Sequence, residues 1–257
     1  MIDVIVLDVD GGPMLDECLA SIRAQTAVAN VIVFDNGSRV PTPNATSRSD
    51  RNLGFAGGAN AALRHSTSDY VALVNNDVVL DREWLVTVRD ALDRDAQLAA
   101  VQTIIRRPDG AIDGAGIDVS DGTYRQIGHG ARLGEPLSVA WGVSATATLY
   151  RRAAIGDRLF DERFFAYYED VELSARLREQ GWRTAVLPVV KATHRGSQSV
   201  HILGKQALRL KTRNRYFVAR LHRGAGRIGA LLWEDARLAL HGRTSPRGII
   251  EGLCSPL

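Results

Sequence analysis

The sequence has few cysteines, no long apolar run and, over one long stretch, no acidic residue. Its two cysteines among 257 residues, Cys18 and Cys254, exclude a disulfide framework and a cysteine-based zinc site. No run approaches the roughly 18–20 apolar residues of a membrane span, and the N-terminus has no charged-then-apolar signal pattern. Hydrophobic residues make up 45% and charged residues 24%, as in globular chains with a large core. We therefore expect a reduced, soluble, cytoplasmic protein.

The missing acidic residues leave one long stretch of the chain strongly basic. Residues 180–233 contain no Asp or Glu but 11 Lys and Arg, whereas the rest of the chain has 21 basic and 29 acidic residues. Such an asymmetry is typical of proteins with an anionic partner: a phosphate-bearing substrate, a membrane surface or nucleic acid. The alternative is a solvated basic face of a helix.

Short apolar runs alternate with helical patterns through the first 105 residues. Strands are predicted at residues 2–8, 31–34, 70–74 and 98–105, and helices at 14–22, 56–63 and 85–92. This alternation predicts an α/β fold with a mainly parallel, Rossmann-like sheet sandwiched by helices.

The second half of the chain is less regular. Residues 106–138 are rich in Gly and Asp and indicate loops or short antiparallel strands. We predict an extended segment at residues 139–150, a helix at 170–180 that is ended by Gly181, and a last strand at 182–190. Two further helices are predicted within residues 203–241, separated by a Gly-rich turn at 224–229. No stretch resembles a linker, so we expect one domain over residues 1–202 with a helical C-terminal extension over 203–257.

Polar residues follow three of the predicted strands, where open α/β sheets bind ligands. Asp8 follows the first strand, Asp35 the second, and Asn75, Asn76 and Asp77 the third. A carboxylate at such a position can accept a base N–H, bind ribose hydroxyls or hold a metal. For Asp35 the alternative is an Asx-turn that closes the strand.

Two further stretches place candidate binding or catalytic residues at the start of a predicted helix. Residues 51–60 form a Gly-rich loop, including Asn52, Gly54 and Gly58, that would let backbone N–H groups approach a phosphate or ribose. Residues 160–172 hold five carboxylates and five aromatic side chains. Acids at a helix start are favoured by the helix dipole, and beside aromatics they also suit a general base next to a sugar.

Together these stretches resemble an inverting glycosyltransferase of family 2 with a GT-A fold, in particular its rhamnosyltransferase-like branch. The resemblance is carried in order by residues 15–25, 31–38, 52–60, 73–80, 141–152, 160–181 and 194–199.

The resemblance implies a role for each candidate residue. Asp170 would be the catalytic base, and Asp77 and His194 would hold Mg²⁺ or Mn²⁺. The substrate-binding candidates are Asp8, Asp35 (at the nucleobase), Asn52, Gly54, Gly58, Asn76, Trp141 and Glu169. The Asp-x-Asp position of the family keeps one carboxylate here, which suffices for Mg²⁺ because this ion retains waters and binds substrate phosphates. The helix start is expected to keep Asp170 ionised.

The implied function is metal-dependent, inverting transfer from a dTDP- or UDP-sugar to an acceptor hydroxyl in glycan or glycolipid synthesis. A sugar-nucleotide pyrophosphorylase or a non-catalytic nucleotide-sugar binding protein is the alternative. Basic residues 205–227 would face an anionic membrane at its inner surface, a lipid-linked acceptor or an acceptor phosphate. A homodimer or solvent face is the other reading of this region, and nucleic acid is not an expected partner.

Overall fold

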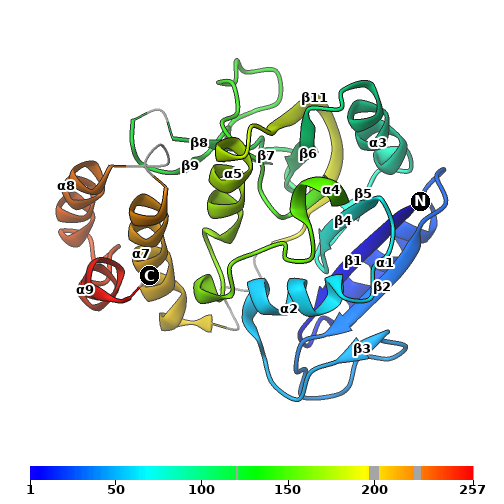
Figure 1. The fold of residues 1–257 in the computed structure, drawn as a ribbon, viewed down its shortest axis with the longest axis horizontal. Coiled ribbons are helices and arrows are strands. Elements are labelled where there is room, and N and C mark those ends of the chain that lie inside the picture. Colours follow the sequence, from blue (N-terminus) through cyan, green and yellow to red (C-terminus); the bar gives the residue numbers. More distant parts are fainter. Residues whose placement is uncertain (120, 197–202, 223–226, 257) are drawn as a thin grey trace.

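One sheet forms the centre of the computed structural model, which describes residues 1–119, 121–196, 203–222 and 227–256 (Figure 1). From edge to edge its strands are β3 (Ser47–Arg48), β2 (Asn30–Asp35), β1 (Ile2–Asp8), β4 (Tyr70–Asn75), β10 (Ala147–Arg151), β6 (Leu98–Arg106), β11 (Arg183–His194) and β5 (Val78–Leu80), with β7 (Ile112–Gly114) paired to β6. A separate small hairpin joins β8 (Ile117–Asp118) to β9 (Arg125–Gln126).

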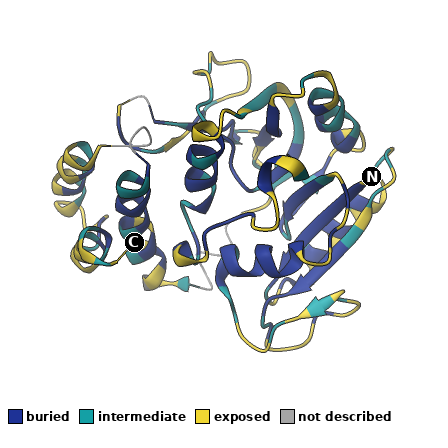
Figure 2. Ribbon diagram, viewed as in Figure 1, coloured by how far each residue is buried: buried dark blue, intermediate teal, exposed yellow. Residues whose placement is uncertain are grey.

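Both faces of the sheet are covered by helices, as the sequence predicts. Val4 and Val6 of β1 join a core with α1 (Gly12–Arg23) and α3 (Trp84–Arg94). Ile5 and Leu7 point the other way, into a core with α2 (Gly54–Leu63), α4 (Arg152–Ile155) and α5 (Glu169–Glu179). Because successive strand side chains alternate between faces, a strand buried on both sides reads as a continuous apolar run (Figure 2).

The sheet is mainly parallel but not entirely so. β2, β1 and β4 are parallel neighbours, as are β6 and β11, whereas β10 lies antiparallel between β4 and β6. A long irregular segment precedes β10, and the strand then runs in the direction opposite to its two neighbours. The predicted extended segment at residues 139–150 is a strand only from Ala147 onward, and the last strand runs to His194 rather than to residue 190.

The C-terminal region contains α7 (Lys205–Leu221), α8 (Ile228–Ala239) and α9 (Pro246–Cys254), of which the sequence analysis predicted the first two. Helix α9 packs closely on α7 because Gly248 and Gly252, one turn apart, leave no room for a Cβ against the α7 backbone. α7 in turn packs on α5 through a cluster that includes Phe217, Val218 and Val171. The predicted turn falls between α7 and α8, although 223–226 lie outside the described residues.

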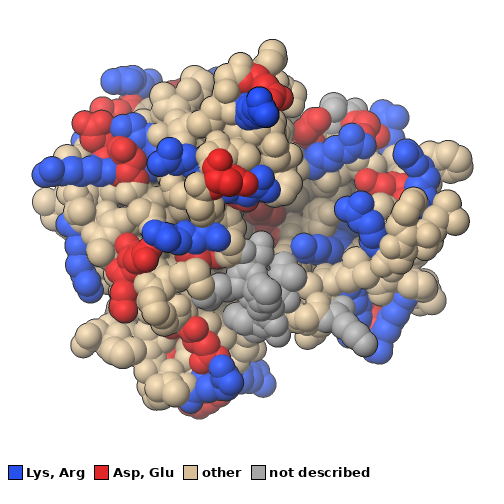
Figure 3. Space-filling model, turned by 180° about the vertical axis from the view of Figure 1, so that it is seen from behind, with Lys and Arg blue, Asp and Glu red and all other residues tan. Residues whose placement is uncertain are grey.

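Most basic side chains of α7 are bonded within the protein. Their partners include Glu251 for Arg209, the Phe164 carbonyl for Arg213, Asp235 and Glu234 for Arg215, and the Gly252 carbonyl for Arg220. On the face seen in Figure 3, Lys and Arg side chains are interspersed with Asp and Glu. The described α7 residues therefore do not form the continuous basic face expected for an anionic surface. In the described part of the chain, no helix combines the length and apolar character needed to cross a membrane.

Candidate functional site

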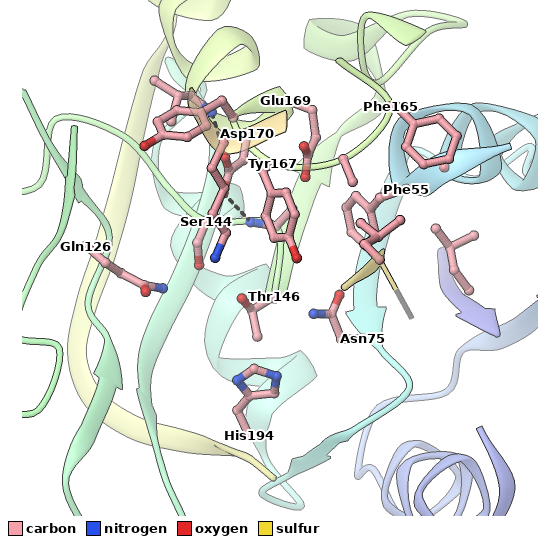
Figure 4. Close-up of a pocket in the computed structure, with 18 of the residues that line it drawn as sticks. Phe55, Asn75, Gln126, Ser144, Thr146, Phe165, Tyr167, Glu169, Asp170 and His194 are labelled. Atoms are coloured by element: carbon pink, nitrogen blue, oxygen red, sulfur yellow. Dashed lines mark hydrogen bonds between the residues drawn. The ribbon is translucent and has the colours of Figure 1, made fainter. Parts of the chain in front are cut away.

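A cavity opens at the edge of the sheet where β1 and β4 end. The first residues of antiparallel β10 reach the same edge, where the amide of Asn75 donates to the carbonyl of Thr146 (3.0 Å). The cavity measures about 580 Å³, within the usual range for small-molecule and cofactor sites. Figure 4 shows Glu169 and Asp170 at one end and His194 at the other, with Thr146 and Asn75 between them.

The structure brings most of the predicted site residues to this cavity. Those that line it are Asn52, Gly54, Asn76, Asp77, Glu169, Asp170 and His194. Those that do not are Asp8, Asp35, Gly58 and Trp141.

Asp35 is buried at the end of β2, and the fold already uses both of its oxygens. Oδ1 accepts a hydrogen bond from the amide of Ser38 (2.8 Å). Oδ2 accepts from the amide of Thr42 (3.0 Å) and from Nη1 of Arg48 (2.5 Å). Burial by itself would raise the pKa of Asp35, but these donors outweigh it and lower the pKa. The turn-closing alternative thus describes its contacts, and binding of a nucleobase stays a prediction.

Asp8 supports the cavity from behind. Its carboxylate accepts hydrogen bonds from the hydroxyl of Thr42 (2.6 Å) and from the side-chain amide of Asn76 (2.8 Å). Asn76 does line the cavity. Asp8 therefore fixes the orientation of a lining residue rather than facing a ligand itself.

Asn36, which directly follows Asp35 at the end of β2, organises the Gly-rich loop. Its Nδ2 donates to the carbonyl of Gly54 (2.9 Å), and its Oδ1 accepts from the amide of Leu53 (3.0 Å). Asn52 closes the loop by accepting the amide of Gly54 (2.8 Å). A Cβ on Gly58 would lie 2.8 Å from Nδ2 of Asn36. Gly58 thus makes room for Asn36 instead of contacting the cavity.

Gly54 joins the Gly-rich loop to the acidic stretch. It has a φ of +76°, and a Cβ there would lie 2.4 Å from the carbonyl oxygen of Phe165. The same carbonyl accepts the amide of Ala56 near the start of α2 (3.0 Å). The two motifs are therefore in direct backbone contact, and no side chain other than glycine fits between them.

Asp77 and His194 meet at one end of the cavity because β11 pairs with β5. Nε2 of His194 lies 3.2 Å from Oδ1 of Asp77, and its Nδ1 lies 2.8 Å from Oδ2 of Asp113. Asp113 on β7 was missed by the sequence analysis. Burial by itself would lower the pKa of His194, but hydrogen bonds and charge from Asp113 and Asp77 raise it to about 10.

These residues fit a divalent cation. Among the described residues, no three or more His, Cys, Asp or Glu side chains converge as a closed metal cluster. However, the 3.2 Å between Asp77 and His194 is close to the roughly 3 Å that separates adjacent ligands of an octahedral Mg²⁺. A carboxylate on the second ring nitrogen, as Asp113 provides, is the usual support of a metal-binding histidine. Waters and substrate phosphates would complete the coordination.

The opposite end holds the carboxyl groups of the buried Glu169 and the half-buried Asp170, and no Lys, Arg or His of the described residues is ion-paired to either. Asp170 accepts the amides of Val171 (2.9 Å) and Ala145 (3.3 Å), but burial outweighs these bonds and raises its pKa to about 6. Burial and the neighbouring Asp170 raise the pKa of Glu169 well above its usual value. Asp170 is thus ionised at pH 7, as expected, although the helix start does not keep its pKa low. Among the described residues, Oε2 of Glu169 is buried and has no hydrogen-bond partner.

The loop before these carboxyl groups is held in a strained shape by α7. Phe165, Tyr167 and Tyr168 all have positive φ, between 63° and 70°, which is costly for aromatic residues. Nδ2 of the fully buried Asn214 lies 2.7–2.9 Å from the carbonyls of Phe164, Ala166 and Tyr167. This contact between distant parts of the chain had no signal in the sequence.

Trp141, a predicted substrate-binding residue, and Glu172 of the acidic stretch do not line the cavity. Trp141 packs in the cluster between α5 and α7, with the guanidinium of Arg178 5.4 Å from its ring centroid. Glu172, on the first turn of α5, lies 3.1 Å from Nε of Arg176 and 3.4 Å from Nε2 of His222. Its carboxylate therefore does not compete with Asp170 for the role of base.

Asp77 and His194 at one end of the cavity and Asp170 at the other match the arrangement that the sequence predicts for a GT-A glycosyltransferase. The family model "Glycosyl transferase family 2" matches residues 4–159, and the chain belongs to this family. The predicted family, fold class and enzyme class are thereby confirmed, and the pyrophosphorylase and non-catalytic alternatives are set aside.

Comparison with known proteins gives relatives of the same kind. The chain is 27% identical over 239 residues to N-acetylglucosaminyl-diphospho-decaprenol L-rhamnosyltransferase of Mycobacterium tuberculosis, covering 77% of each chain.

Among solved structures, the mannosyltransferase PcManGT of Pyrobaculum calidifontis, in complex with GDP-Man and Mn²⁺, has a TM-score of 0.62 at 17% identity. The match covers 98% of this chain and 83% of that one. Residues 1–349 of S. aureus TarS, in complex with UDP-GlcNAc, have a TM-score of 0.61 at 18% identity, and the match covers 86% of this chain and 64% of that one. A longer TarS structure matches 85% of this chain, which spans 42% of that protein.

Proposed function

We propose that this glycosyltransferase moves a deoxyhexose such as L-rhamnose from a dTDP- or UDP-sugar to a hydroxyl of a lipid-linked N-acetylglucosaminyl diphosphate, with inversion. The acceptor and the sugar class are taken from the M. tuberculosis relative, which aligns over most of both chains. The observation that carries the proposal is the presence of Asp77, His194 and Asp170 around one cavity.

The base end suits the chemistry of the acceptor. Oδ of Asp170 accepts the proton of the acceptor hydroxyl while that oxygen forms its bond to the anomeric carbon of the donor. The bond from the anomeric carbon to the diphosphate breaks on the opposite face, and its electron pair leaves with the nucleoside diphosphate. Amides of Ala145 and Val171 hold the Asp170 carboxylate in place for this transfer.

The other end suits the leaving group. Asp77 and His194 would hold Mg²⁺ or Mn²⁺, which would take the place of the proton on Nε2 of His194 and supply positive charge to offset the charge on the leaving diphosphate. Asp113 would keep the His194 ring in the orientation that presents Nε2. Asn76, fixed by Asp8, and the loop around Asn52 and Gly54 would bind the nucleotide part of the donor.

Transfer assays with purified protein test the proposal. dTDP-rhamnose, UDP-sugars and GDP-mannose are offered with a short-chain N-acetylglucosaminyl-diphospho-lipid, with Mg²⁺ or Mn²⁺ and with EDTA. The expected product is a disaccharide with inverted anomeric configuration by NMR, formed only with metal. Transfer at full rate in EDTA would remove the metal from the mechanism, and transfer to none of the donor–acceptor pairs would overturn the assignment of substrates.

The cellular site remains a separate proposal. A protein that modifies a lipid-linked acceptor works at the membrane surface, so we place it in the cytoplasm with peripheral attachment to the inner face. The support is the acceptor class of the relative, and fractionation of cells into soluble and membrane pools checks it.

A further inference from the structure

Lys211 differs from the other described cations of α7 because it faces the cavity and has no anionic partner. It lines the cavity, and its Nζ lies 4.5 Å from the ring centroid of Tyr167. Arg125 is the other Lys or Arg among the described lining residues, and it is ion-paired to Asp121 at 2.5 Å. Within the described residues, no carboxylate lies within ion-pair distance of Lys211.

The surroundings of Lys211 leave its charge uncompensated. Lys211 is an exposed residue, and partial desolvation at the cavity lowers the pKa of its ammonium, with no carboxylate acting in the opposite direction. The contact with the face of Tyr167 holds the charge at the cavity. An anion bound there would gain more from this cation than from the neighbouring arginines of α7, whose hydrogen bonds go to groups of the protein.

The position of Lys211 indicates which anion this is. Tyr167 lies just before Glu169 and Asp170, so Lys211 belongs to the base end of the cavity and not to the end formed by Asp77 and His194. The acceptor must place its hydroxyl at Asp170, so the acceptor occupies the base end. The diphosphate of the donor leaves toward the opposite end.

We propose that Lys211 binds the diphosphate of the acceptor and thereby selects sugar diphosphates over uncharged glycosides. This inference rests on the proposed function, since it concerns the second substrate of that reaction. It also gives the C-terminal extension a direct part in substrate choice, because Lys211 is the residue of α7 that reaches the cavity with a free charge.

The test compares two acceptors and three variants. N-acetylglucosaminyl-diphospho-farnesol carries the diphosphate, and octyl N-acetylglucosaminide lacks it. Lys211→Gln and Lys211→Met remove the charge, Lys211→Arg retains it, and Arg23→Gln on the exposed surface of α1 is the matched control for charge loss. Binding of each acceptor and of the nucleoside diphosphate is measured by calorimetry, and transfer is measured separately.

We expect the charge-removing variants to weaken binding of the diphosphate acceptor, and to raise its KM, by about ten- to a hundredfold. Affinity for the octyl glycoside and for the nucleotide should stay the same, and Lys211→Arg and Arg23→Gln should behave as wild type. Equal binding of the diphosphate acceptor by wild type and Lys211→Gln would overturn the proposal. So would weaker nucleotide binding in that variant, which would assign Lys211 to the donor. If wild type binds the diphosphate acceptor without transferring to it, the proposed function fails while the role of Lys211 in binding stands.

Discussion

The two ends of the cavity contain similar residue types, but the surroundings of their ionisable groups differ. At one end His194 lies between Asp77 and Asp113, and these carboxylates raise its pKa to about 10. At the other end the buried Glu169 and the half-buried Asp170 are neighbours, no described Lys, Arg or His lies within ion-pair distance of either, and desolvation raises the pKa of Asp170 to about 6. One end is rich in negative charge that a cation can neutralise, and the other holds a carboxylate ready to take up a proton.

This difference shows why burial alone does not define a role. Both ends are buried at the same sheet edge, and the neighbours of each group decide whether its charged form is favoured. A site that must bind Mg²⁺ or Mn²⁺ gathers acids around a histidine. A site that must accept a proton near neutral pH keeps cations away from its carboxylate.

The largest expected effect is at the base end. Asp170→Asn keeps the shape of the side chain but removes the proton acceptor, and we expect transfer to fall by about 10²–10⁴-fold. Nucleotide affinity should persist, as calorimetry with the nucleoside diphosphate and Mn²⁺ would show. Glu169→Gln is the matched control: because the raised pKa of Glu169 favours its protonated form, this variant should lose far less. If Glu169→Gln is inactive and Asp170→Asn transfers normally, the two roles must be exchanged.

The cation end should respond to a residue that does not touch the metal. Asp113→Asn removes the negative partner of His194 Nδ1, and we expect Mn²⁺ affinity in the presence of nucleotide to fall by about 10–100-fold. Electron paramagnetic resonance of free Mn²⁺ measures this without any turnover. Asp109→Asn on the adjacent exposed turn is the control and should leave the affinity unchanged. Unaltered Mn²⁺ binding in Asp113→Asn would separate His194 from the metal site.

The base end also depends on a distant helix. Asn214→Ala leaves the carbonyls of the strained loop without their buried donor, and we expect the free energy of unfolding to fall by about 1–3 kcal/mol. Because this loop leads directly into Asp170, kcat should fall while nucleotide affinity is retained. Denaturant titration and steady-state kinetics measure the two effects, with the surface amide variant Asn30→Ala as control. A stable Asn214→Ala protein with full kcat would exclude the positioning role.

The sequence could predict the site residues whose signal is local. Asp77 follows a strand and Asp170 begins a helix, so both could be predicted from the residues around them. Asp113 lies 81 residues from His194, and Asn214 lies 47–50 residues from the carbonyls that it binds, so their partners became visible only in the fold. Lys211 was predicted only as one of many basic residues of a helix. Its difference from the others depends on which of them already have partners.

Some predictions placed a residue correctly in the chain but not in the cavity. Asp35 and Asp8 do follow buried strands, yet their carboxylates bond to nearby donors such as Arg48 and Thr42. A strand-end position does not tell whether a carboxylate points to a ligand or closes its own turn. Gly58 likewise lies in the predicted loop region, but its missing side chain makes space for Asn36.

The pH dependence provides a smaller and more specific test of the comparison. Since Asp170 acts only when ionised, kcat/KM should fall about tenfold per unit as the pH drops below about 6.

Stability should change in the opposite direction. The folded-state pKa of this carboxyl lies above its unfolded value of 3.8, so the folded state takes up the proton first as pH falls from about 6 toward 4. Its contribution to the free energy of unfolding therefore becomes more favourable in that window, and the ionised form costs stability at neutral pH. Asp170→Asn should accordingly melt at a higher temperature than wild type at pH 7.5, with a smaller difference at pH 4.5 that disappears only below the unfolded pKa of 3.8. A variant that melts lower at pH 7.5 would contradict the view that this end of the cavity keeps an uncompensated charge.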